Sequence, residues 1–235
     1  PWDGFGDTFE NKPYIQKKQI ENWHLEGLKW EDFAPTAARY FGMISQTDAS
    51  LGLILDELKK TGQYDNTLII LLSDHGDTCG SHGMLDKHYI LYDDVVHVPM
   101  IVRGPGIPHR DVDAFVSSSL DVAPTVEKLV GLEAKSARHG KAVTEEDGDF
   151  AVFTSNGQQF GLFTPTKDYK YIWNLTDTDE FYVLTDDPGE LVNRAACPEY
   201  KDVMTSLGEV LIAELKRRGD PFASGWVAWQ CGRGE

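Results

Sequence analysis

The chain has 235 residues, of which 41% are hydrophobic, and a formal net charge of −16. This acidic balance argues against nucleic acid as a partner, because binding to a phosphate backbone needs clustered Lys and Arg. It does not exclude a small anionic substrate, since a bound metal ion and one lysine can reverse the local field in a pocket. No apolar run approaches the about 20 residues that a transmembrane helix needs, so no membrane segment is expected. The three cysteines are too widely spaced for a disulfide framework or a zinc knuckle: Cys79, Cys197 and Cys231. Cysteine usage therefore does not indicate whether the protein works in an oxidising or a reducing compartment.

The first part of the chain is predicted to be irregular and then helical. Residues 1–34 mix aromatic and charged side chains, which favours a segment draped over the surface with short helical turns. Because the sequence begins at Pro1 without a starting methionine, we expect a processed, incomplete or trimmed chain. From Thr36 to Thr61 the apolar spacing predicts an amphipathic helix that ends near Gly62. Its apolar face comprises Tyr40, Ile44, Leu51, Ile54, Leu55 and Leu58.

Two apolar runs follow this helix. The residues from Thr67 to Ser73 predict a strand buried on both faces, of the kind found in parallel sheets under helices. A second strand is predicted from Val98 to Val102, and a helix from Asp121 to about Val130. This order of elements is typical of an α/β fold. We therefore predict an α/β domain over residues 1–143.

After about residue 143 the pattern changes to short aromatic and β-branched segments. The runs 150–154, 161–164, 169–173 and 181–184 predict a small antiparallel sheet. An apolar stripe from Pro198 to Arg218 predicts a final helix. A small antiparallel α+β subdomain is therefore expected over residues 144–235.

The residues that can carry chemistry follow the first predicted strand. Ligands bind beyond the carboxyl ends of the strands in open α/β sheets, and a carboxylate beside an imidazole suits a divalent metal. Asp74 and His75 are thus either metal ligands or a helix cap with a turn histidine. Lys87 either holds an anionic oxygen or is a solvated loop lysine. His82 either supports the site by a hydrogen bond or is a loop histidine.

The remaining candidates favour ordinary roles. His88 and His97 are expected to be structural, and the other three histidines to lie at the surface: His24, His109 and His139. Cys79 lacks a nucleophile signature around it. The tripeptide Asn174-Leu175-Thr176 matches a glycosylation sequon, but such tripeptides are common by chance.

In combination, several motifs resemble the type I sulfatases of the alkaline phosphatase superfamily. The motifs are Leu71–Gly76, Gly80–Gly83 with Lys87, Tyr92–Val102, Ala38–Gly52, Ser119–Thr125, and Asp168–Ile172 with Phe181–Leu184 and Asp187–Asn193. The resemblance implies a sulfatase-like, mainly parallel sheet with flanking helices, followed by the small subdomain. It also implies that Asp74 and His75 complete a Ca²⁺ site and that Lys87 contacts the sulfate of a sulfate ester. His82 is expected to assist catalysis by a hydrogen bond to the residues that bind the metal and the sulfate.

Two family features are absent from this sequence. Family members carry a Cys- or Ser-x-Pro-x-Arg motif, whose first residue becomes the formylglycine nucleophile, and a pair of aspartates on the first strand. Neither is found here. The chain therefore resembles the C-terminal portion of a sulfuric ester hydrolase, lacking the formylglycine segment and expected to be nearly inactive alone. The alternatives are a phosphodiesterase or phosphonate monoester hydrolase of the same superfamily, or a non-catalytic truncated relative. A missing N-terminal segment or an oligomer is expected to cover the apolar edge of the sheet.

Overall fold

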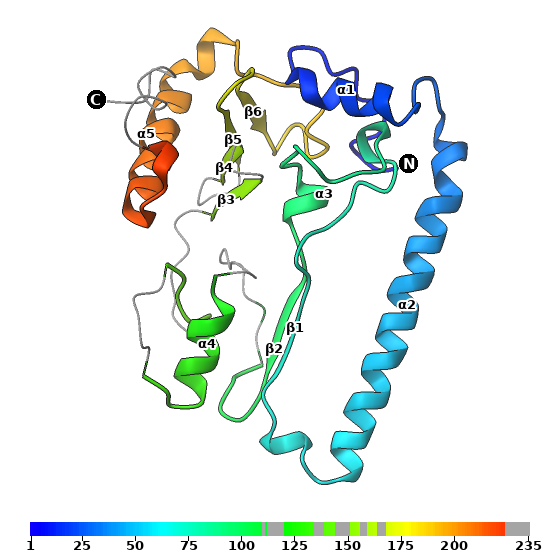
Figure 1. The fold of residues 1–235 in the computed structure, drawn as a ribbon, viewed down its shortest axis with the longest axis vertical. Coiled ribbons are helices and arrows are strands. Elements are labelled where there is room, and N and C mark those ends of the chain that lie inside the picture. Colours follow the sequence, from blue (N-terminus) through cyan, green and yellow to red (C-terminus); the bar gives the residue numbers. More distant parts are fainter. Residues whose placement is uncertain are drawn as a thin grey trace.

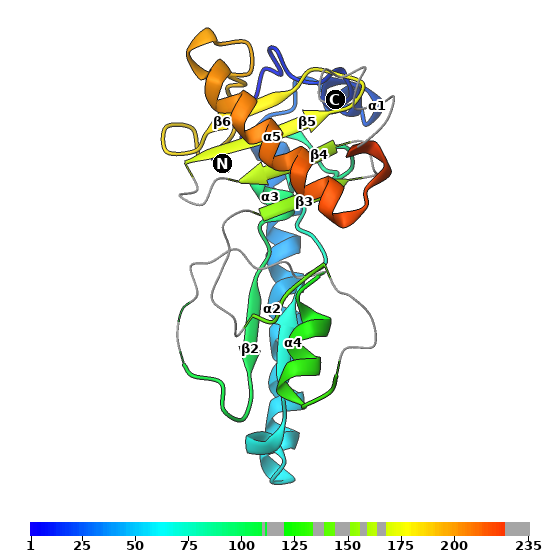
Figure 2. The same cartoon turned by 90° about the vertical axis from the view of Figure 1, so that its left-hand side faces the viewer.

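The elements form two groups along the long axis of the molecule (Figures 1 and 2). The computed structural model describes residues 1–109, 111, 120–133, 139–143, 151–155, 159–163 and 168–223, with backbone only for 151–155 and 160–163. One end holds a four-stranded sheet, and the other holds a two-stranded ribbon. The helices are α1 (Tyr14–Asn22), α2 (Trp30–Lys60), α3 (Asp93–Val96), α4 (Val122–Leu129) and α5 (Lys201–Arg218). The strands are β1 (Ile69–Leu72), β2 (Met100–Arg103), β3 (Ala151–Ser155), β4 (Gln159–Phe163), β5 (Tyr169–Asn174) and β6 (Glu180–Val183).

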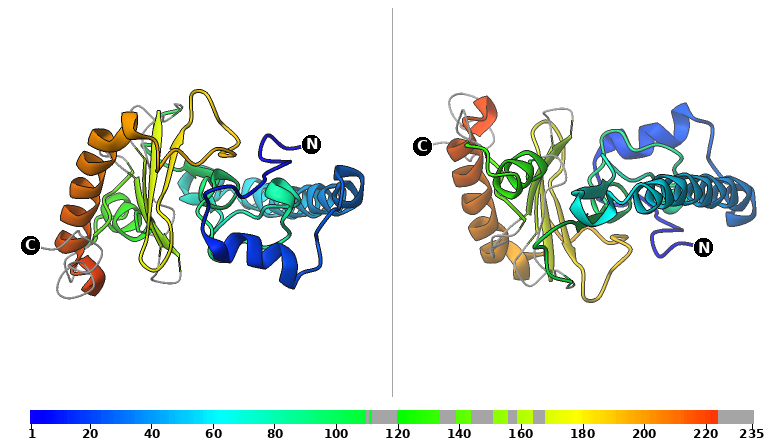
Figure 3. Two further views of the ribbon diagram at one scale, coloured as in Figure 1. Left: turned by 90° about the horizontal axis from the view of Figure 1, so that it is seen from above. Right: turned by 90° about the horizontal axis from the view of Figure 1, so that it is seen from below.

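The four-stranded sheet confirms the predicted small antiparallel sheet in the C-terminal part of the chain. Its strands follow chain order, β3-β4-β5-β6, and every neighbouring pair is antiparallel. Positions 150 and 164 of the predicted strands lie outside the described residues. The predicted last helix is also confirmed as α5, which lies across one face of the sheet (Figure 3).

Side-chain alternation along β5 and β6 divides the core into two layers. Tyr171 and Trp173 face α5 and pack with Leu211 and its neighbours, because alternate side chains of a strand point to opposite faces. Ile172 and Tyr182 lie on the other face, in a separate buried cluster. That second cluster is completed by a loop from the middle of the chain: Met84, Ile90, Leu91, Tyr92 and Val95.

The N-terminal segment is part of the fold's interior as well as its surface. The predicted helical turn forms as α1, which lies on the side of the sheet opposite α5 (Figure 3). Gln16 of α1 is fully buried and donates a hydrogen bond to Glu180 of β6 at 2.9 Å. Lys12 is buried nearby. The prediction of a draped surface segment is therefore only partly right, since buried polar partners anchor this segment to the sheet.

The mainly parallel sheet predicted for residues 1–143 is not confirmed. β1 and β2 pair antiparallel, with Ile69 opposite Arg103 and Leu72 opposite Met100. The segment between β1 and β2 contains only the short helices Ser81–Gly83 and α3. A parallel pair of strands is usually joined by a longer crossover helix, which carries the chain back to the end of the sheet where the first strand began. β1 is also not buried on both faces, because its residues are half-buried and Leu72 is 38% exposed.

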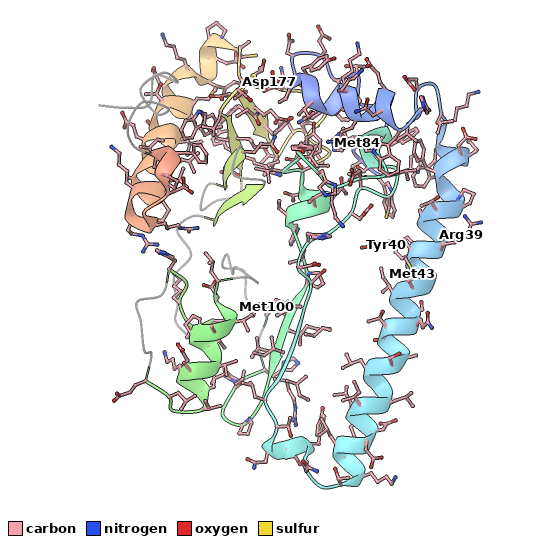
Figure 4. All side chains as sticks on the ribbon, viewed as in Figure 1. Arg39, Tyr40, Met43, Met84, Met100 and Asp177 are labelled. Carbon is pink, nitrogen blue, oxygen red and sulfur yellow. The ribbon has the colours of Figure 1, made fainter. Side chains whose placement is uncertain are left out.

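Helix α2 confirms the predicted helix, and it starts earlier than the spacing indicated. Only Phe33 and Ala37 in its first turns are buried. Tyr40 extends from α2 toward the β1–β2 ribbon, whereas Arg39 extends the opposite way (Figure 4). Several large apolar side chains of α2 remain exposed: Phe41, Met43, Ile44, Leu53 and Ile54. None of the described helices is both long and apolar enough to cross a membrane.

Candidate functional site at the end of strand β1

The loop after β1 is a tight turn held by its own polar groups. Ser73 Oγ donates to the carbonyl of His75 at 2.8 Å, and the amide of His75 donates to Asp74 Oδ1 at 2.9 Å. Short polar side chains that bond to nearby backbone favour such turns over a continued strand. The apolar strand therefore stops at the first residues able to make these bonds, and Asp74 and His75 project from its end.

The ring of His75 is oriented by a backbone carbonyl. Its Nδ1 lies 2.8 Å from the oxygen of Gly76, and a carbonyl can only accept, so Nδ1 carries the proton in the neutral ring. The lone pair is then on Nε2, which lies 3.5 Å from Asp74 Oδ2. A histidine that donates one ring N–H to a backbone carbonyl and keeps the other nitrogen free has the arrangement of a metal ligand.

Asp74 is the exposed member of the pair. Its side chain is 84% exposed, and the backbone hydrogen bond from His75 holds the pKa of its carboxyl below the usual value. The charge of Lys87 also lowers that pKa, as the smallest of its causes. Asp74 is thus an accessible carboxylate that is ionised at neutral pH.

Lys87 is half-buried and is presented by the turn at Asp86. The amide of Lys87 donates to Asp86 Oδ1 at 2.7 Å, and the carbonyl of Asp86 accepts from Thr78 Oγ1 at 3.0 Å. Lys87 follows Asp74 and His75 in the segment between β1 and α3. The Asp74 carboxylate and His75 Nε2 can bind a cation, whereas the Lys87 ammonium can bind an anion.

His82 occupies a different environment. Its side chain is 1% exposed, its Nδ1 lies 2.7 Å from Asp7 Oδ2, and its ring stacks on Tyr92 at a centroid distance of 3.7 Å. Burial lowers the pKa of His82. Burial alone would raise the pKa of Asp7, but the bonds and charges of His82 and Lys12 outweigh it and keep the carboxyl ionised. His82 can therefore influence the loop only through its neighbours, such as Asp94, whose Oδ2 lies 3.8 Å from its Nε2.

The other candidates occupy ordinary positions. The surface histidines are exposed as predicted, and the exposed His88 and His97 each pair with an aspartate. Cys79 is buried, and that burial raises the pKa of its thiol to about 12. The side-chain amide of Asn174 donates hydrogen bonds to the carbonyl of Thr178 and to the carboxylate of Glu180, so the sequon asparagine is not accessible for glycosylation in the folded chain. Cys231 lies outside the described residues.

Asp74 and His75 are the pair of described residues to test against the needs of a metal ion. The described residues contain no group of three or more His, Cys, Asp or Glu side chains arranged to hold an ion. The Asp74–His75 pair nevertheless fits a divalent cation, since two ligands at right angles in a shell of about 2.4 Å lie about 3.4 Å apart. Two ligands alone bind a cation weakly, so the pair is suited to being one side of a site.

Comparisons with known proteins identify the family of the chain. Residues 5–132, more than half of the chain, match the protein family described as Sulfatase. The chain belongs to the sulfatase family. It is 32% identical over 196 residues to the Escherichia coli protein named "Uncharacterized sulfatase YidJ", a match that covers 79% of this chain and 39% of that protein. It is 28% identical over 227 residues to the Delta 4,5-hexuronate-2-O-sulfatase of Bacteroides thetaiotaomicron, covering 88% of this chain and 45% of that protein.

The chain also has the fold of solved structures of sulfatases and of a related hydrolase. It superposes on the phosphonate monoester hydrolase of Agrobacterium radiobacter with a TM-score of 0.73 and 29% identity, covering 81% of this chain and 43% of that one. It superposes on BT1596, described as a 2-O GAG sulfatase, with a TM-score of 0.64 and 28% identity, covering 72% and 40%. The chain thus spans 39–45% of the length of the curated relatives named here.

Sequence reasoning missed the buried charges behind the loop. Lys12, Lys170 and Glu190 are all buried and lie around Asp93 and Tyr92 at the end of the second core cluster. One signal was present in the sequence. Lys170 interrupts the aromatic strand Tyr169–Trp173, and a lysine on a buried strand face requires an ionic partner.

Proposed function

We propose that Asp74 and His75 hold one side of a calcium ion and that Lys87 contacts the sulfate group of a sulfate ester. The observation that carries this proposal is the 3.5 Å approach of His75 Nε2 to Asp74 Oδ2, with the Nδ1–H of His75 already given to a carbonyl. Membership of the sulfatase family and similarity to sulfatases support the substrate class. The chain would then form part of a sulfuric ester hydrolase.

Each residue has a distinct task in this proposal. A bound cation would stabilise negative charge that develops on the sulfate oxygens. Asp74 provides an ionised carboxylate because its pKa is lowered. His75 provides a neutral ring nitrogen, and Lys87 adds a positive charge that does not depend on the metal. His82 supports the loop from its buried position.

The nucleophile is proposed to come from outside these 235 residues. None of the cysteines is followed by x-Pro-x-Arg, and the raised pKa of Cys79 makes its thiol a poor nucleophile. We therefore expect little turnover by the isolated chain. We also propose that the mainly parallel sheet, the formylglycine and the remaining metal ligands belong to the completed fold.

Calcium titration of the chain tests the metal assignment. With ¹⁵N-labelled histidine, addition of Ca²⁺ is expected to shift the Nε2 resonance of His75, and Asp74→Asn is expected to abolish the shift. His97 is a matched control, since it is also an exposed histidine beside an aspartate. If His97 and His75 respond equally, or if neither responds at millimolar Ca²⁺, the metal assignment is wrong.

A phosphonate monoester hydrolase is the second candidate. It is favoured by the similarity to the phosphonate monoester hydrolase of Agrobacterium radiobacter, with a TM-score of 0.73. The coding DNA on the amino-terminal side of Pro1 should be sequenced first. If it carries Cys- or Ser-x-Pro-x-Arg, turnover of an aryl sulfate and an aryl phosphonate by the product of that frame decides between the two. If the motif is absent, both hydrolase proposals fail and a non-catalytic relative is favoured.

A further inference from the structure

Glu190 is a buried carboxylate at a junction of distant segments. Its side chain is almost fully inaccessible, and its Oε2 accepts the backbone N–H of Asp93 at 2.6 Å. Its own carbonyl accepts from Lys12 Nζ at 2.5 Å. Glu190 also has a φ of +53°, a left-handed conformation that is unusual for a residue other than glycine. Strain of this kind persists only where the surrounding contacts require it.

Lys170 gives this carboxylate its counter-charge. Because side chains alternate along β5, Lys170 lies on the same face as Ile172, toward α3 rather than toward α5. Its Nζ lies 2.5 Å from Glu190 Oε1 and 3.2 Å from Asp93 Oδ1, and its side chain has no solvent exposure. The first residue of α3 is therefore held by both its backbone N–H and its carboxylate.

Helix α3 in turn holds the loop that carries the ligand pair. The amide of Gly76 donates to the carbonyl of Val95 at 2.8 Å. The backbone is so close that a Cβ on Gly76 would lie 1.9 Å from the carbonyl oxygen of Asp94. The position of α3 thus sets the position of Gly76, and the carbonyl of Gly76 is the group that orients the ring of His75.

We propose that Glu190 is a positioning residue for His75. The inference rests on the proposed function, in which His75 is a metal ligand. Glu190 fixes the start of α3, α3 fixes Gly76, and the carbonyl of Gly76 keeps the proton of His75 on Nδ1 and its lone pair on Nε2. Without Glu190, α3 and Gly76 shift, and the His75 ring loses its single orientation toward Asp74.

The test measures the proton position of His75 in the full 235-residue chain, without metal, by ¹⁵N NMR of labelled histidine. His75→Gln assigns the resonances. In the wild type, Nδ1 is expected to carry the proton in the neutral ring. Glu190→Ala is expected to abolish that preference, whereas Glu190→Gln keeps an oxygen that can accept from the Asp93 amide and is expected to restore it.

A second pair of variants avoids removing the buried carboxylate. Asp93→Pro deletes the N–H that donates to Glu190, at the first position of a helix, where proline is tolerated. Tyr92 has a ψ of 155°, the extended backbone that a residue before proline requires. Asp93→Ala is the matched control, since it removes the same side chain and keeps the N–H. The proline variant is expected to lose the Nδ1–H preference and the alanine variant to keep it.

A stability control separates positioning from general loosening. Leu211→Ala lowers stability from the opposite face of the sheet and is expected to leave His75 unchanged. If Leu211→Ala changes the His75 tautomer as much as Glu190→Ala does, or if Asp93→Pro leaves it unchanged, the positioning role is wrong.

Calcium affinity provides a separate readout. Loss of the hydrogen-bond partner of a metal-ligating histidine typically weakens metal binding by roughly 10–100-fold. Glu190 acts on that partner, the Gly76 carbonyl, through α3, so Glu190→Ala should lower Ca²⁺ affinity by up to about tenfold. If the wild-type chain binds no Ca²⁺, the proposed function fails at that step. The metal-free tautomer comparison still decides whether Glu190 positions His75.

Discussion

The burial of Glu190 is expected to make folding stability depend on pH near neutrality. Burial raises the pKa of Glu190 from 4.5 to about 7, against the opposing charge of Lys170. In this range the native state binds more protons than the unfolded state, so stability falls as the pH rises from 4.5 through 7. Between pH 5.5 and pH 8.5 this difference corresponds to a loss of about 2 kcal/mol at 25 °C.

Glu190→Gln isolates this contribution from those of the other groups that face the carboxylate. These groups are Lys170 on β5, Asp93 on α3, Lys12 of the N-terminal segment, and the buried Tyr92 and Tyr182. All of them remain in the variant. His82 acts in the opposite direction, because its lowered pKa makes stability fall as the pH drops, and it too is unchanged.

Denaturant unfolding at several pH values between 5.5 and 8.5 measures the effect. The range stays above the isoelectric point of about 4.7, where the chain would associate for other reasons. The free energy of unfolding of the variant, taken relative to the wild type, should rise by about 2 kcal/mol across the range. Two parallel curves would show that Glu190 ionises at an ordinary pKa, and the reasoning from burial would then be refuted.

Four further results are expected. Gly76→Ala should destabilise the chain by about 1–3 kcal/mol or more, because its Cβ would meet the backbone of α3. Gly52→Ala, on the open surface of α2, should stabilise it by about 0.5–1 kcal/mol in the same unfolding assay. Leu211→Ala should cost about 2–5 kcal/mol, whereas Leu53→Ala, at an exposed position, should change stability by less than about 0.5 kcal/mol. Sedimentation should show self-association of the wild-type chain through the exposed face of α2, which Ile54→Lys weakens; a monodisperse wild-type monomer would contradict this.

The elements of this fold were predictable where a local pattern decides them. Helix α5 and the strands of the C-terminal sheet follow from spacing and from turn residues, and the structure confirms them. The pairing of β1 with β2 was not predictable in the same way. An apolar run such as Ile69–Leu72 is typical of a buried parallel strand, but its partner and direction depend on the path of the connection, which local sequence does not determine.

The candidate site was predictable to a different extent. Asp74, His75 and Lys87 lie within one loop, so a motif could indicate all three. The contacts of His82 with Asp7 span 75 positions, and the contact of Asp93 with Glu190 spans 97. No periodicity joins such distant residues. The only local indication was a lysine within an aromatic strand, and that shows the need for a partner without identifying it.

These long-range contacts connect the segment between β1 and α3, and α3 itself, to both ends of the chain. The family match ends at residue 132, yet Lys170 and Glu190, which hold α3, lie beyond it. Lys12 reaches the same junction from the N-terminal segment through the carbonyl of Glu190. The C-terminal sheet is therefore more than a support beside the sulfatase-matched region. Lys170 of β5 and Glu190, which follows β6, hold the start of α3, so a chain cut after residue 132 would retain Asp74 and His75 but lose the contacts that anchor α3.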